Sequence, residues 1–111
     1  MTGGKRSRAK GDRIEREIVA RHKAIPIHAE RVPLSGAARY QGNSGDIDVY
    51  AFGPEEAPLV GEVKARRNGE SFKTLERWLG DNDLIFLRRN GADPLVVLPW
   101  STWARLLERR Q

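Results

Sequence analysis

Two β-rich runs flank a turn in the middle of the chain, and they constrain its fold more than any other feature. The first run covers residues 46–52 (DIDVYAF), the second covers residues 59–65 (LVGEVKA), and Gly and Pro mark the turn at 53–58 between them. Two such runs on either side of a turn of this composition are typical of a β-hairpin. The sequence therefore predicts a hairpin against which the other elements pack.

Further elements are predicted on both sides of this hairpin. A helix is expected over residues 12–24, with Asp12 as its N-cap and Pro26 beyond its end. The remaining predicted elements are a strand at 27–33, a loop at 34–45, a helix at 70–80, strands at 83–87 and 95–98, and a helix at 101–110. This order, α-β-β-β-α-β-β-α, predicts an α/β fold with one mixed central sheet flanked by helices.

The length of the chain, 111 residues, suits one domain. Residues 1–11 carry four cations and no acid among small residues, so we interpret them as a flexible basic arm ahead of a single domain at 12–111. No apolar run resembles a signal peptide or a membrane span. We therefore expect an intracellular, cytoplasmic protein without a membrane partner.

The composition narrows the chemistry. There is no cysteine, which excludes disulfides, thiolate metal sites and a cysteine nucleophile, and there are only two histidines. A bound metal would be held mostly by oxygen, which favours Mg²⁺ or Mn²⁺. The chain has 20 Lys and Arg against 15 Asp and Glu, a net charge of +5. This balance suits a nucleic-acid partner, because fixed cations release counterions from phosphates.

Carboxylates on the predicted hairpin are the first candidates for a site. Because strand side chains alternate between faces, Asp46 and Asp48 share one face, and Glu62 and Lys64 share a face of the next strand. Pairing the strands could place Asp46 beside Glu62, where a divalent metal would offset the repulsion of two carboxylates. The alternative is an ordinary half-exposed hairpin with a solvated charged face.

Glu15 is a further candidate on the first predicted helix. At about 100° per residue it falls within the apolar arc that contains Ile14 and Ile18, where a carboxylate is costly unless it is paired. Asp12 and Glu15 also have the spacing of a capping box, which is the structural alternative.

Taken together, four runs of the sequence resemble a known family. Residues 11–19 (GDRIEREIV), 31–36 (RVPLSG), 45–47 (GDI) and 61–64 (GEVK) are similar in order and spacing to the archaeal-type Holliday junction resolvases of the PD-(D/E)XK nuclease superfamily. The resemblance implies a restriction-endonuclease-like core of order α-β-β-β-α-β, here followed by an extra strand and helix. It also implies a metal-dependent DNA endonuclease that acts as a homodimer on four-way junctions.

The resemblance assigns roles to individual residues. Glu15, Asp46 and Glu62 would bind Mg²⁺ or Mn²⁺, Lys64 would assist catalysis, and Ser35 would support cleavage; Asp48 is an alternative metal ligand. The Pro of the P-D motif is replaced by Gly45, which is tolerable because Pro is not a ligand. From Asp83 onward the chain resembles small phage-type nucleases more than the resolvases.

Two interaction surfaces are expected around this site. Cations that flank it are candidate DNA-binding residues, namely Arg31, Arg39, Arg66, Arg67 and Lys73. An apolar stripe of Trp100, Trp103, Leu106 and Leu107 is a candidate dimer interface or part of the domain's own core. A phage-type DNA nicking or processing nuclease and a non-catalytic nucleic-acid-binding module remain the alternative functions.

Overall fold

The computed structural model describes residues 3–32, 45–66 and 69–109, with side chains described from residue 11 onward. The described chain is a small α/β protein with three helices and two antiparallel sheets, and the order of its elements is the predicted one. It divides into two compact units, residues 1–65 and residues 66–109, which are described separately. That residues 12–111 form one domain stays a prediction.

The first unit begins with the long helix α1 (Gly3–Lys23). Its predicted start at Asp12 was wrong, because residues 3–11 of the expected flexible arm are helical. Lys, Arg and Ala, which fill most of positions 5–10, are strong helix formers, and a single Gly11 costs only about 1 kcal/mol. The helix ends as expected, in a turn at Ala24–Pro26, where the N–H of Ile27 donates to the carbonyl of His22 over 2.9 Å.

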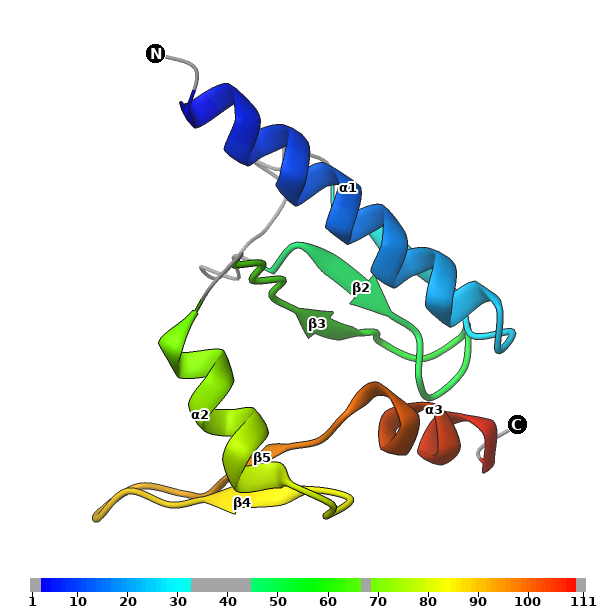
Figure 1. The fold of residues 1–111 in the computed structure, drawn as a ribbon. Coiled ribbons are helices and arrows are strands. Elements are labelled where there is room, and N and C mark those ends of the chain that lie inside the picture. Colours follow the sequence, from blue (N-terminus) through cyan, green and yellow to red (C-terminus); the bar gives the residue numbers. More distant parts are fainter. Residues whose placement is uncertain (1–2, 33–44, 67–68, 110–111) are drawn as a thin grey trace. The chain divides into compact units, whose positions relative to one another are not determined.

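Three short strands form the sheet of this unit: β1 (Ala29–Arg31), β2 (Ile47–Val49) and β3 (Leu59–Gly61). They pair in the order β1-β2-β3, both pairs antiparallel, and α1 runs beside them (Figure 1). The connection between β2 and β3 contains Gly53 at φ 117°, a conformation that favours glycine. The predicted hairpin is confirmed, although its strands are shorter than the runs at 46–52 and 59–65 that predicted them.

The core of the first unit lies between α1 and this sheet. Alternate strand residues point towards the helix, which buries Ala29, Ile47 and Val49. Among the described residues of this unit, Val19 and His22 of α1 and Ile27 and Ala51 from the flanking segments are also buried. The opposite face of the sheet, which includes Glu30, Asp48 and Val60, is more open.

The second unit contains α2 (Glu70–Leu79), β4 (Ile85–Leu87), β5 (Leu95–Val97) and α3 (Trp100–Arg109). Gly80 (φ 51°) ends α2, and a turn that contains Gly91 (φ 78°) joins β4 to β5. These two strands pair antiparallel and form a sheet of their own.

The prediction of one mixed sheet was therefore wrong. A parallel pair needs a crossover such as α2 between the two paired strands. The strand that follows α2 is β4, and it pairs with β5 through a short turn instead. Among the described helices, none has the length and apolar character that a bilayer crossing requires.

Candidate metal and nuclease site

Asp46 directly precedes β2, the middle strand of the sheet, and its backbone is hydrogen-bonded to the segments on both sides. Its carbonyl accepts the N–H of Val32 over 2.9 Å, and its own N–H donates to the carbonyl of Gly61 over 2.7 Å. Its carboxylate oxygen Oδ2 accepts the N–H of Val63, also over 2.7 Å. The last two bonds join Asp46 to the residues immediately before and after Glu62.

Gly45 explains how the chain comes so close at this point. A Cβ atom built on Gly45 would lie 2.1 Å from Cγ1 of Val60 and 3.1 Å from the carbonyl oxygen of Gly61. Real Cβ atoms essentially never approach within 3.0 Å of a non-bonded heavy atom outside the neighbouring residues. A side chain at position 45 would therefore force Val60 and the neighbouring backbone at Gly61 to shift.

Glu62 and Lys64 follow directly after β3. The Lys64 ammonium nitrogen Nζ lies 3.0 Å from Oε2 of Glu62, and both side chains are largely open to solvent, 61% and 45% exposed. Val63, between them, is less exposed. Exposed and less exposed side chains therefore alternate along residues 62–64, as predicted, although these residues lie beyond the end of β3.

Asp48, the alternative metal ligand, lies within β2. It is half-buried and stands opposite Glu30 of β1 and Val60 of β3. Glu30 also lies 3.3 Å from Nε2 of His28, whose ring stacks at a tilt on Tyr50 with 5.0 Å between the ring centroids.

Glu15 points from α1 towards the sheet, as its position in the apolar arc predicted, and forms an ion pair there. Oε1 of Glu15 accepts the Nε–H of Arg31 over 3.1 Å, and Oδ1 of Asp12 accepts from Nη2 of the same guanidinium over 2.8 Å. The side chains of Glu15 and Arg31 are only 18% and 27% exposed. Arg31 stands opposite Ile47, so Glu15 lies at the same end of the sheet as Asp46.

The ion pairs of Arg31 with Asp12 and Glu15 bear on two predictions made from the sequence. Asp12 lies inside α1 rather than at its first residue, so the capping-box alternative was wrong. Arg31, a candidate phosphate contact, has two carboxylate partners in its own chain. No sequence signal at separations of 16 and 19 residues could have indicated these pairs, because they depend on the packing of α1 on β1.

His22 of α1 is buried and lies within the apolar arc of the helix. Its Nδ1 lies 2.8 Å from the carbonyl oxygen of Ile18, one turn earlier in the helix. Burial lowers the pKa of His22 below its usual value, while the hydrogen bond to Ile18 opposes this shift. We assign it to packing rather than to ligand binding.

The other candidate DNA contacts are dispersed. Arg66 and Lys73 of the second unit are both exposed, Lys73 on α2. Ser35, Arg39 and Arg67 lie outside the described residues. Of the candidate dimer stripe on α3, Leu107 is buried and Leu106 is exposed, while Trp100 and Trp103 are intermediate.

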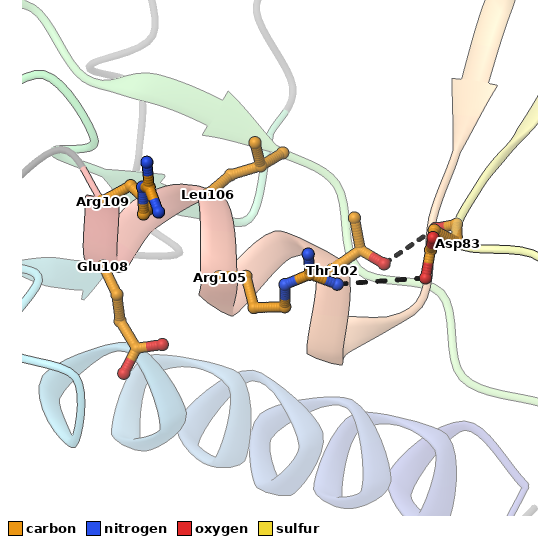
Figure 2. Close-up of a pocket in the computed structure, with 6 residues that line it drawn as sticks. All are labelled: Asp83, Thr102, Arg105, Leu106, Glu108 and Arg109. Atoms are coloured by element: carbon orange, nitrogen blue, oxygen red, sulfur yellow. Dashed lines mark hydrogen bonds and ion pairs between the residues drawn. The ribbon is translucent and has the colours of Figure 1, made fainter.

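A pocket of about 450 Å³ lies in the second unit and contains none of the predicted site residues. Figure 2 shows the six side chains that line it, namely Asp83, Thr102, Arg105, Leu106, Glu108 and Arg109. The Thr102 hydroxyl donates to the carbonyl of Asp83 over 2.8 Å, and Nη1 of Arg105 lies 3.9 Å from Oδ1 of Asp83. The Thr102 bond ties the start of α3 to the segment before β4.

Within the described ranges, no three Asp, Glu or His side chains come close enough together to hold a metal ion. The donor set where β2 begins and β3 ends still fits Mg²⁺, which commonly takes one or two carboxylates together with water and substrate phosphate. Asp46 and Glu62 supply those two carboxylates. Comparison with protein-family models, curated proteins and solved structures found no match.

Proposed function

We propose that this chain is a divalent-metal-dependent DNA endonuclease that hydrolyses phosphodiester bonds. One observation carries the proposal: Asp46 is hydrogen-bonded to the residues on both sides of Glu62, and Lys64 is ion-paired to Glu62. Two carboxylates and an ammonium thereby lie on two neighbouring, hydrogen-bonded segments of the chain. These are the groups that phosphodiester hydrolysis with a hard cation requires.

Asp46 and Glu62 would hold Mg²⁺ or Mn²⁺. When bound, the ion would polarise the scissile phosphate and lower the pKa of a coordinated water. The bond from the Val63 amide fixes the orientation of the Asp46 carboxylate. Because that bond satisfies one lone pair only, the carboxylate keeps further acceptor capacity for a cation.

Lys64 would act on the phosphate itself. Its ammonium carries three donors, and only one needs to face Glu62. The others can donate to a non-bridging phosphate oxygen, whose charge increases as water attacks phosphorus and the ester P–O bond breaks. An exposed lysine next to a carboxylate is suited to this task, since its ammonium is open to solvent and can reach the substrate.

We propose Glu15 as a third metal ligand, although it would first have to release or share the guanidinium of Arg31. Its carboxylate is paired with Arg31, so it can contact a metal only by leaving or sharing that guanidinium. Arg31 would then be released towards the DNA. Ser35 as a residue that supports cleavage, and Asp48 as a replacement ligand, belong to the same proposal.

The excess of cations supports the proposed DNA binding. A net charge of +5 favours a polyanion, and the exposed Arg66 and Lys73 are phosphate contacts in this proposal, as are Arg39 and Arg67. Within the endonuclease class we propose a structure-specific Holliday junction resolvase. Its two symmetric incisions need two active sites and therefore a homodimer.

A substrate panel tests the proposal. The protein is incubated with Mg²⁺ or Mn²⁺ and labelled four-way junction, flap, duplex and single-stranded DNA, and the cuts are mapped. Paired incisions near the branch point are expected. Cleavage of plain duplex in preference to the junction would favour a nicking or processing nuclease, and salt-sensitive binding without any cleavage would favour a non-catalytic module.

A further inference from the structure

The β4–β5 sheet of the second unit exposes large apolar side chains on both faces. Phe86 and Val96 stand opposite each other on one face and are 70% and 52% exposed, while Leu95, opposite Leu87 on the other face, is 66% exposed. A two-stranded sheet is marginally stable on its own in water. Among the described strands, β4 pairs only with β5, which leaves its second edge open to another strand.

We propose that the open edge of β4 pairs with β4 of a second copy of this chain. The pairing is antiparallel and centred on Phe86, so that the two hairpins form a four-stranded sheet across a two-fold axis. A two-fold axis makes the same surface serve on both copies, and antiparallel self-pairing of one strand is the arrangement that such an axis produces. The two Phe86 side chains then meet across the axis, where aromatic cross-strand pairs are favourable.

The charges around Phe86 complement each other in this register. Asp83 lies three residues before Phe86 and Arg89 lies three residues after it. Extending the antiparallel register outward from Phe86 therefore places Asp83 of each copy opposite Arg89 of the other. Both side chains are exposed, and the dimer contains this pair of opposite charges twice. A second copy thus provides both apolar and charged partners for the side chains along the open edge of β4.

The edge of β5 is less suited to the same pairing. Pro94 directly precedes the strand and Pro99 follows two residues after it. Proline has no N–H to donate to a neighbouring strand, and it is a common means of blocking a sheet edge. Of the two edges, β4 is therefore the one that can take up a second copy.

This interface rests on the second unit alone and does not depend on the proposed nuclease chemistry. It replaces the α3 stripe as the candidate dimer contact, because Leu107 of that stripe is buried, 2% exposed, in the chain itself. If the endonuclease proposal also holds, the dimer joins two copies of the Asp46 and Glu62 site. Dimer formation and metal-dependent cleavage then fail or succeed separately, whereas paired incisions at a junction require both.

Charge reversal tests the register directly. The full-length chain is measured by sedimentation velocity over a concentration series, alone and as the variants Asp83→Arg and Arg89→Asp. Each variant places like charges opposite one another at two positions, so the dimer dissociation constant is expected to rise about tenfold or more. Mixing the two variants restores opposite charges at both positions, and the heterodimer should form with the affinity of the unmodified chain.

Control variants separate this effect from others. Asp83 also lies 3.9 Å from Arg105, so Arg105→Ala, which removes that contact without touching the register, should leave the dimer intact. Arg77→Asp on α2 repeats the charge change of Arg89→Asp at another exposed position. Circular dichroism checks that every variant is folded. A monomeric unmodified chain, or a dimer that both reversals leave unchanged, would overturn the proposal.

Discussion

Among single residues, Asp46 combines a structural and a proposed chemical task. Its backbone and its carboxylate bond to the chain on both sides of Glu62. Asp46→Asn keeps an oxygen that can accept the Val63 N–H but removes the negative charge. We expect the fold and DNA binding to persist and cleavage to fall by at least about 100-fold, since even outer-shell partners of a metal typically cost 10–100-fold. Asp48→Asn is the matched comparison, and a larger loss there would move the metal ligand to Asp48.

Glu15 and Glu17 offer a second matched pair on α1. Glu15 is half-buried against Arg31, whereas Glu17 is exposed and pairs with Arg21 one turn away. Glu15→Gln should lower the free energy of unfolding by about 1 kcal/mol, and Glu17→Gln by less than about 0.5 kcal/mol. Cleavage should also fall for Glu15→Gln only. Chemical denaturation measures the change in stability, and the cleavage assay measures the change in activity. Larger losses for Glu17→Gln than for Glu15→Gln would contradict the assignment of Glu15 to the face of α1 that packs on the sheet.

His22 makes the stability of the fold depend on pH. Burial lowers its pKa in the folded state below 6.5, so below that pH the unfolded chain binds a proton that the folded chain resists. The stabilising effect of the neutral ring is thus complete above about pH 6.5 and decreases as the pH falls towards the folded pKa. His22→Gln should flatten the decline in unfolding free energy between about pH 7 and about pH 5. His28→Gln, at an exposed position, should retain it, and identical slopes in all three proteins would refute the assignment.

The sequence alone predicted some features of the candidate residues but not others. Glu62 and Lys64 follow from alternation along one segment, and the burial of Glu15 follows from helical periodicity. The partners of these residues do not follow from either pattern. The bond from Val63 to Asp46 and the pairing of Arg31 with Asp12 and Glu15 join segments far apart in the chain, and they depend on how those segments pack.

Among the elements, the order of helices and strands was predictable because Gly and Pro punctuate the chain between apolar runs. Two features of the elements could not be predicted from the sequence. The first turns of α1 contain no apolar periodicity, so only intrinsic helix propensity indicates them. The pairing of β4 with β5, rather than with the first sheet, depends on which edges meet, and the pattern of a single strand carries no such information.

The β2–β3 hairpin can be tested at Gly45. Gly45→Ala would bring a methyl group against Val60 and the Gly61 carbonyl, and the resulting strain should cost about 1–3 kcal/mol of stability and displace Asp46. Gly11→Ala is the control, since nothing lies within 4 Å of its Cβ position in the interior of α1. There the substitution should stabilise the protein by about 0.5–1 kcal/mol. Thermal unfolding measures both, and equal effects at the two glycines would contradict the close approach.

In the molecule as a whole, the proposed chemistry and the proposed dimer contact belong to different units. Glu15, Asp46, Glu62 and Lys64 lie in residues 1–65, and the β4–β5 sheet lies in residues 66–109. A substitution can therefore be made at residues that only one of the two proposals involves. The excess of positive charge is a property of the entire chain, and it concerns DNA affinity rather than the identity of the reacting groups.

The most direct measurement is the dependence of DNA cleavage on divalent metal in the unmodified chain and in Glu62→Gln. Glu62→Gln removes a carboxylate that is largely open to solvent, so the folded state should be kept while the affinity for the cation is lost. We predict that a labelled four-way junction is cut in Mg²⁺ or Mn²⁺, that excess chelator abolishes the cuts, and that Glu62→Gln binds the junction but cuts at least about 100-fold more slowly. Full cleavage in excess chelator, or near-normal cleavage by Glu62→Gln, would contradict the assignment of this site.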